Sequence, residues 1–160
     1  MMEIIKVGMA DLNVTGYPNA LTTLGLGSCV GVCIYDTKTK IIGMIHIMLP
    51  YSWGVKNNTN PAKFADTGIP LLIEKMEELG AAKKNMLAKL AGGAQMFEVT
   101  RSEFMNIGKR NVEAAKKVLQ EQNIPIVAED TGGNYGRTII FYSEDGRLEI
   151  KTIGKGTKTI

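Results

Sequence analysis

The chain has 160 residues, of which 44% are hydrophobic and 22% charged, and its formal net charge is +3. This length and composition are typical of one globular domain, which we expect to span residues 1–160. The weak, dispersed charge excludes the basic footprint of a nucleic-acid-binding protein, and no apolar run approaches the roughly 18 residues that a membrane span requires.

The cellular compartment is predicted from the cysteines and the N-terminus. Cys29 and Cys33 lie only four positions apart, so they provide no disulfide framework of the kind that secreted domains use. The first residues contain an acid and no apolar stretch long enough for a signal peptide. Both features indicate a reducing, cytoplasmic environment.

The first half of the chain predicts a strand, a hairpin and a helix. Short apolar runs predict strands over residues 4–8, 30–35 and 41–49. Apolar residues then recur at helical spacing over 69–79, with Asn60-Pro61 as the start and Gly80 as the stop. Because Pro70 would remove a hydrogen bond from a helix interior, residues 62–67 are predicted to form a separate turn before the main helix.

The second half predicts a strand, a second helix and three more strands. The helix is expected over residues 106–122, and the strands over 86–90, 124–128, 138–142 and 147–153. This order is neither a clean βαβ alternation nor an all-β pattern. We therefore predict an α+β fold, a layered sandwich of mixed β-sheet with two main helices.

Three features that resemble functional motifs are unconvincing as sites. The run GLGSCVG at 25–31 has its third glycine one residue too late for a dinucleotide loop. Cys29 and Cys33 lack further ligands for a structural zinc ion, so we expect neither a metal nor another cofactor. The neighbouring acids Glu129 and Asp130 point in different directions, which favours a capping or backbone-binding loop over an acid–base pair.

Cys29 and His46 are the strongest candidate pair. If residues 36–39 form a four-residue hairpin loop, Tyr35 faces Lys40. Antiparallel partners keep a constant sum of residue numbers, so Cys29 would lie opposite His46, with Cβ atoms about 4.5–5.5 Å apart. A slip of one residue would send the two side chains to opposite faces of the sheet.

Taken alone, each of these residues is typical of a hydrophobic core, and Cys33 remains a core residue. Taken together, Cys29 and His46 have the ingredients of a nucleophile and its base. Gly27 and Ser28, just before the cysteine, are the candidates for substrate binding or for an oxyanion hole, because backbone N–H groups can converge there.

These residues lie within a pattern that resembles the CheD family of chemoreceptor glutamine deamidases. The resemblance is carried by TLGLGSCV at 23–30 and HIMLP at 46–50, and it extends over most of the chain. Further matching motifs are KFADT at 63–67, AGGAQMF at 91–97, NIG at 106–108, RN at 110–111 and EDTGGN at 129–134.

The resemblance implies a fold related in its catalytic core to cysteine-dependent deamidating toxins. It implies Cys29 as the nucleophile, His46 as the base and Thr23 as the third member of a triad. The implied substrates are glutamine side chains of methyl-accepting chemotaxis receptors. Because a methyl ester would give the same acyl-enzyme, weak methylesterase activity is expected as a side activity. The implied partner is the phosphatase CheC, which links the family to the response regulator CheY. The alternative is a binding module that occupies receptors or CheC without turnover.

Overall fold

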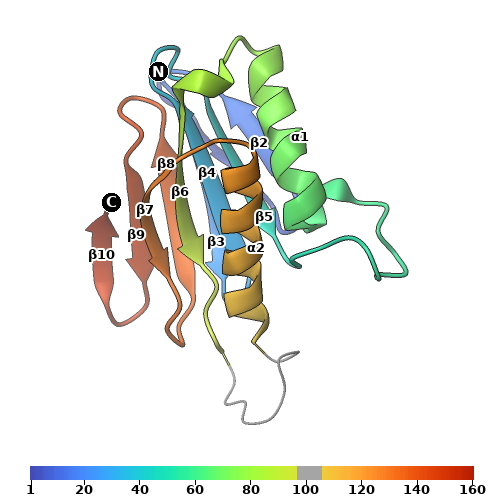
Figure 1. Cartoon of the computed structure of the whole chain (residues 1–160). Helices are drawn as coiled ribbons and strands as arrows, with labels where there is room; N and C mark the ends of the chain where they lie inside the picture. The colour runs from blue at the N-terminus through green and yellow to red at the C-terminus, as the bar shows by residue number, and fades with distance from the viewer. Residues whose placement is uncertain (97–105) are drawn as a thin grey trace.

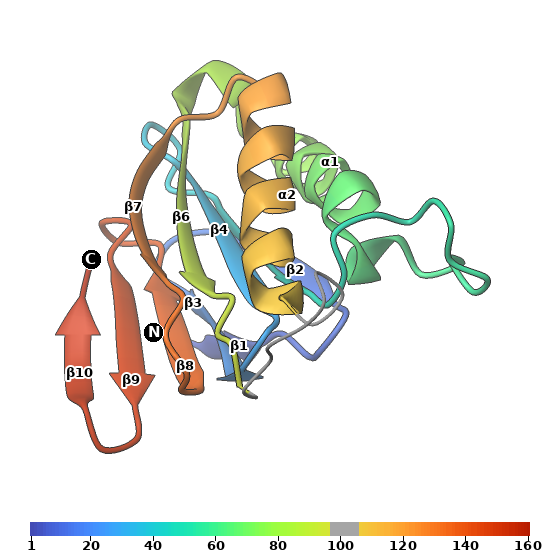
Figure 2. The same ribbon diagram turned by 60° about the horizontal axis from the view of Figure 1, so that its bottom comes forward.

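The computed structural model describes residues 1–96 and 106–160, which form three layers (Figure 1). Both helices cover one face of a five-stranded mixed sheet, and a second five-stranded mixed sheet packs against its other face (Figure 2). The strands of the middle sheet are β2 (Leu12–Thr15), β5 (Ile42–Ile47), β4 (Val30–Asp36), β6 (Met86–Gly92) and β7 (Ile126–Thr131), in spatial order. Those of the outer sheet are β1 (Ile4–Lys6), β3 (Ala20–Leu26), β8 (Arg137–Tyr142), β9 (Leu148–Thr152) and β10 (Gly156–Thr159).

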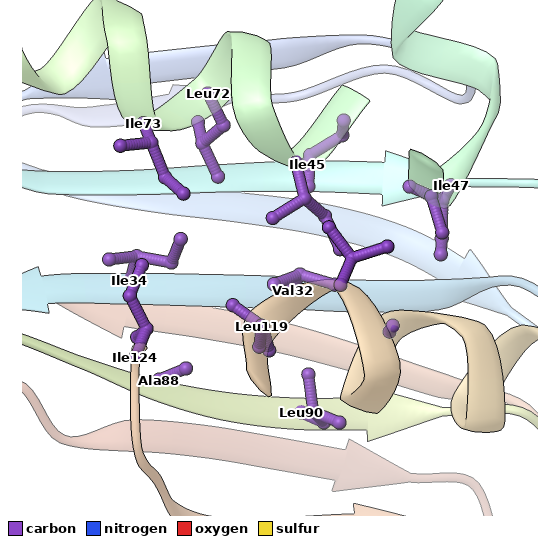
Figure 3. Close-up of a cluster of buried hydrophobic side chains, with 14 of the residues drawn as sticks. Val32, Ile34, Ile45, Ile47, Leu72, Ile73, Ala88, Leu90, Leu119 and Ile124 are labelled. Atoms are coloured by element: carbon purple, nitrogen blue, oxygen red, sulfur yellow. The ribbon is translucent and has the colours of Figure 1, made fainter. Parts of the chain in front are cut away.

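The middle sheet is buried on both faces, and alternation along its central strands separates two cores. Every second residue of β4 and β5 packs against the helices, as Figure 3 shows for Val32, Ile34, Ile45 and Ile47. The residues between them, such as Cys33 and Met44, pack against the outer sheet. His46 lies between Ile45 and Ile47, so its side chain points toward the outer sheet. The predicted layered α+β sandwich is confirmed.

The helices confirm the predicted elements with shifted boundaries. The expected separate turn over residues 62–67 is only partly present, because residues 65–67 already belong to the main helix. Before it lies a 3₁₀ helix, η1 (Pro61–Lys63), capped by the Asn60 side chain, which accepts a hydrogen bond from Ala62 N–H. The main helix α1 (Ala65–Glu78) begins earlier than expected and contains Pro70. The short 3₁₀ helix η2 (Lys83–Asn85) precedes β6, and α2 (Ile107–Glu121) falls within the predicted 106–122. Neither helix of the described residues is long and apolar enough to cross a membrane.

Three strands were not expected from the sequence. β2 has four residues and β10 is exposed along its whole length, so neither shows the alternation of a half-buried strand. β3 is interrupted by Gly25, which has a φ of 68°, and its pairing with β8 shifts between Thr23 and Leu26. Such a bulge hides the period of two on which strand prediction depends.

The predicted hairpin register is wrong by two residues. His46 pairs with Gly31, not with Cys29. The turn lies one residue later than expected, because Asp36 N–H donates to Ile41 O at 2.9 Å and leaves residues 37–40 as the loop. The Asp36 carboxylate accepts hydrogen bonds from Lys38 N–H and Thr39 N–H, which fixes this turn. A shift of two residues preserves the face, so Cys29 and His46 still share one side of the sheet as diagonal neighbours.

Candidate active site

The candidate site lies between the two sheets, where β4 begins and β5 ends. Its three side chains are buried: Thr23 is 0% exposed, His46 1% and Cys29 8%. Thr23 comes from β3 of the outer sheet, whereas His46 and Cys29 come from β5 and the residue before β4 in the middle sheet. Cys29 packs in the core between the sheets. The fold therefore brings all three predicted residues to the same inter-sheet space.

Thr23 fixes the tautomer of His46. The Thr23 hydroxyl lies 2.7 Å from Val7 O and 2.7 Å from His46 Nδ1. Because a carbonyl oxygen can only accept, the single hydroxyl proton is donated to Val7 O. His46 Nδ1 must then donate to the Thr23 oxygen, which leaves Nε2 of the neutral ring as a bare acceptor. A bare Nε2 is what a base needs in order to take a proton from a thiol.

Without substrate, the Cys29 thiol and the His46 imidazole are both favoured in their uncharged forms. Burial raises the pKa of the Cys29 thiol, although its own backbone N–H partly offsets the effect. Burial also lowers the pKa of His46. His46 Nε2 is buried and has no hydrogen-bond partner among the described residues, so no hydrogen bond joins it to the Cys29 thiol in this state. Both shifts favour thiol and imidazole over thiolate and imidazolium.

Labelling of Cys29 with iodoacetamide is expected to speed up continuously as the pH rises through and beyond the range in which ordinary thiols ionise. A raised thiol pKa and a lowered imidazole pKa both keep the thiolate scarce in acid. The measurement is the labelling rate against pH in a Cys33→Ala background. A plateau of fast labelling below about pH 7 would contradict the neutral pair, because it marks a stable thiolate–imidazolium pair.

The loop that carries Cys29 is held through its carbonyl groups. Gly27 O accepts from Ala94 N–H, and Cys29 O accepts from Gly93 N–H, both at 2.8 Å. Gly27 N–H donates to Gly25 O at 3.0 Å, so it is not available for the oxyanion hole in which Gly27 was expected to take part. Among the described residues, Ser28 N–H and Cys29 N–H donate to no backbone carbonyl. These two N–H groups are therefore the donors left for an oxyanion.

Gly92 lies where the backbone of β6 closely approaches the Cys29 loop. Its φ is 109°, a conformation that side chains rarely adopt, and a Cβ at this position would overlap Cys29 O. Gly93 is pressed in the same way against the start of α2, where Gly108 O would lie 2.9 Å from its Cβ. Phe97, the last residue of the motif that contains these glycines, lies outside the described residues. The described part of the motif therefore packs against the loop that carries Cys29.

Two buried polar residues near this loop were missed by the sequence analysis. The Asn111 amide on α2 donates to Ser28 O and to Met48 O, both at 3.0 Å. Arg137 on β8 donates to Gly132 O at 2.9 Å and to Gly92 O at 3.4 Å. Asn111 belongs to the pair RN at 110–111, one of the motifs that carry the family resemblance, whereas Arg137 belongs to none of them. Nothing in the sequence placed either side chain near the Cys29 loop.

The acids Glu129 and Asp130 act through ion pairs, contrary to the predicted capping loop. Both lie on β7, where Glu129 pairs with Lys116 at 2.8 Å. Asp130 pairs with Arg137 at 3.1 Å and with Lys158 at 2.9 Å. Burial disfavours the charge of Asp130, yet hydrogen bonds from Lys158 and Arg137 hold its pKa below the ordinary value. In residues 1–96 and 106–160, no three or more His, Cys, Asp or Glu side chains form a group suited to a metal ion.

Comparisons with known proteins agree on one family. The family model described as CheD chemotactic sensory transduction matches residues 48–152. A protein of Caldanaerobacter subterraneus subsp. tengcongensis, named probable chemoreceptor glutamine deamidase CheD, is 62% identical over 99% of this chain and 98% of its own length. The chemoreceptor glutamine deamidase CheD of Halalkalibacterium halodurans is 54% identical over the full length of both chains.

A solved structure supports the fold alone. The crystal structure of a DUF152 protein from Neisseria meningitidis superposes with a TM-score of 0.55, covering 91% of this chain and 76% of that one, at 12% sequence identity. The family follows from the sequence matches, which include a model spanning more than half of the chain and relatives more than half identical over nearly all of it. The chain therefore belongs to the CheD family.

Proposed function

We propose that the chain hydrolyses the side-chain amide of specific glutamines on methyl-accepting chemotaxis receptors, leaving glutamate. The observation that carries this proposal is the Thr23–His46 hydrogen bond, which leaves a bare Nε2 on the face that Cys29 shares. Full-length relatives named chemoreceptor glutamine deamidase support the choice of substrate. Cys29 is the nucleophile, His46 the base, and Thr23 the residue that orients the imidazole.

The reaction begins with a neutral thiol. As Sγ of Cys29 attacks the side-chain carbonyl carbon, His46 Nε2 takes the thiol proton. The tetrahedral oxyanion accepts hydrogen bonds from Ser28 N–H and Cys29 N–H. When the intermediate collapses, the imidazolium gives its proton to the departing nitrogen, and ammonia leaves a thioester on Cys29. Thr23 accepts from Nδ1 throughout, so the ring keeps its orientation.

The second half of the reaction releases glutamate. A water molecule gives a proton to His46 Nε2 and attacks the thioester carbonyl, and the sulfur leaves and is reprotonated by the imidazolium. A methyl ester of the same residue would form the same thioester, so weak methylesterase activity is expected as a side reaction. Each deamidation adds a negative charge to a receptor helix, where repulsion or pairing with neighbouring helices shifts the signalling equilibrium.

A groove next to the site supports a protein substrate. It has a volume of about 340 Å³ and lies between the start of α2 and the segment that follows β5. Trp53 stands 71% exposed on its wall, stacked on Tyr51. Arg110 lines the same groove and forms no ion pair with another described residue. An aromatic anchor beside an unpaired cation suits an amphipathic receptor helix better than a small free amide.

Mass spectrometry of a purified receptor cytoplasmic fragment tests this function. Incubation with the wild-type protein should convert particular glutamines to glutamate, with a gain of about 1 Da per site and release of ammonia. A wild-type protein that binds the fragment and converts no glutamine would leave the binding-module alternative in place of the enzyme. We also propose a cytoplasmic location for the reaction, a proposal supported by the two free cysteines, because free thiols persist in reducing compartments.

We also propose that CheC is a partner and that it docks over the same groove as the receptor. This proposal rests on the family resemblance. Two ligands cannot occupy overlapping surfaces, so adding CheC is expected to slow receptor deamidation in proportion to its occupancy. The measurement is the initial deamidation rate during a titration with CheC. An unchanged rate at saturating complex would show that the partner and the receptor use separate sites.

A further inference from the structure

Asn111 is a fully buried amide that contacts both halves of the candidate site. Its side chain is on α2, and its Nδ2 donates to Ser28 O and to Met48 O, each at 3.0 Å. Ser28 directly precedes the nucleophile, and Met48 follows the base by two residues. A single NH₂ group therefore connects the loop before β4 to the segment after β5.

The bond to Ser28 O has a direct effect on the nucleophile. Ser28 C=O and Cys29 N–H belong to one peptide group, and in a planar trans peptide the two bonds point in opposite directions. A donor that holds the oxygen on the helix side consequently turns the Cys29 N–H toward the inter-sheet side, where Cys29 packs. Burial raises the pKa of the Cys29 thiol and this N–H partly offsets the effect, as expected of an N–H that lies on the same side as the sulfur.

The other carbonyl groups of the loop do not depend on a side chain. Gly27 O and Cys29 O are held by the backbone N–H groups of Ala94 and Gly93. Among the described residues, Asn111 provides the one side-chain hydrogen bond to this loop. Its Oδ1 is buried and has no partner among those residues, so the bonds to Ser28 O and Met48 O are the hydrogen bonds that this amide makes there. Loss of the amide would leave Ser28 O and Met48 O without this donor, so its effect on the fold has to be separated from its effect on the oxyanion.

We propose that Asn111 is a positioning residue that aims Cys29 N–H at the oxyanion formed during attack on the glutamine amide. The proposal rests on the proposed function and deepens it. Asn111 touches neither substrate nor sulfur; it acts through the Ser28–Cys29 peptide. Its second bond, to Met48 O, keeps the end of β5 in place relative to that peptide, so the base and the oxyanion donor stay aligned.

The test separates oxyanion stabilisation from general disruption of the site. Asn111→Leu removes both donors and the unpaired oxygen, and Asn111→Asp removes the donors at nearly constant shape. Each variant is assayed for deamidation of the receptor fragment and for the reaction of Cys29 with methyl methanethiosulfonate. The latter is a sulfur–sulfur exchange in which sulfinate leaves, so it forms no oxyanion on carbon. Cys33→Ala serves as the common background for the thiol reaction.

For Asn111→Leu, kcat for deamidation is expected to fall by about 10²-fold or more, as on loss of one oxyanion donor, with KM nearly unchanged. The thiol reaction should keep its rate within about twofold. Asn111→Asp should show the same split, with a larger loss because its carboxylate repels both carbonyl oxygens. Asn123→Asp, the same change at an exposed position beyond the other end of the helix, is the matched control and should behave as wild type.

Two outcomes overturn the inference. An unchanged kcat in Asn111→Leu would show that the amide positions nothing that the reaction needs. An equal loss in both reactions would show a structural role in holding the thiol accessible. Failure of the wild-type protein to deamidate would instead refute the proposed function, and it would be recognised before any variant is compared.

Discussion

Cys29→Ala is expected to abolish conversion of receptor glutamine to glutamate, with a fall in rate of about 10⁵-fold or more. No other group in the site can form the acyl intermediate, and His46 is left with no thiol to deprotonate. The substitution removes one buried sulfur and should leave the sandwich folded. Mass spectrometry of the receptor fragment measures the conversion, and binding of the fragment by the variant verifies that the surface is intact.

Cys33→Ala is the matched control for that variant. Cys33 is fully buried between the sheets, and burial raises its thiol pKa far above the ordinary value. Cys33→Ala removes a sulfur atom, as Cys29→Ala does, but four positions away from Cys29. The variant should therefore keep most of the activity. Deamidation by Cys29→Ala at a wild-type rate would remove the thioester mechanism, whichever residue then proved to be responsible.

Gly92→Ala is expected to lower the free energy of unfolding by about 3–5 kcal/mol. The new methyl group would overlap Cys29 O, and the residue would have to keep a φ of 109°. Relief requires moving the Cys29 loop away from β6, so the surviving folded protein should also lose deamidase activity. Chemical denaturation measures the first effect, and the receptor assay measures the second.

Gly154→Ala separates the two causes of that loss. Gly154 has a φ of 78°, but its Cβ would lie in open space, with no atom within 4 Å. Only the strain of a positive φ applies there, so the free energy of unfolding should fall by about 1–2 kcal/mol and the activity should be full. Equal losses at the two glycines would show that contact with the Cys29 carbonyl contributes nothing to the fold.

The site could be predicted in part because sheet geometry tolerates an error of two residues. The hairpin turn was placed one residue early, since nothing in the apolar pattern shows that Asp36 would pair with Ile41 and cap the turn with its carboxylate. The resulting register error of two kept Cys29 and His46 on one face. An error of one residue would have separated them.

The contacts of Thr23 and Asn111 could not be predicted from local sequence patterns. Thr23 lies on a strand whose period is broken by the bulge at Gly25, and its partner His46 belongs to the other sheet. Only the family resemblance indicated its role. Asn111 reaches Ser28 across 83 positions of the sequence, a contact that depends on how α2 packs on the middle sheet. Long-range packing decides both contacts, and periodicity in a single sequence carries no information on it.

The division of the triad between two sheets has a consequence for the newly made protein. The Thr23 hydroxyl belongs to the outer sheet and the His46 imidazole to the middle one, so the tautomer with a bare Nε2 is fixed only after the two sheets have packed together. A chain in which one sheet has formed without the other carries the thiol but has no oriented base. Assembly of the sandwich thus limits activation of the Cys29 thiol to the fully folded protein.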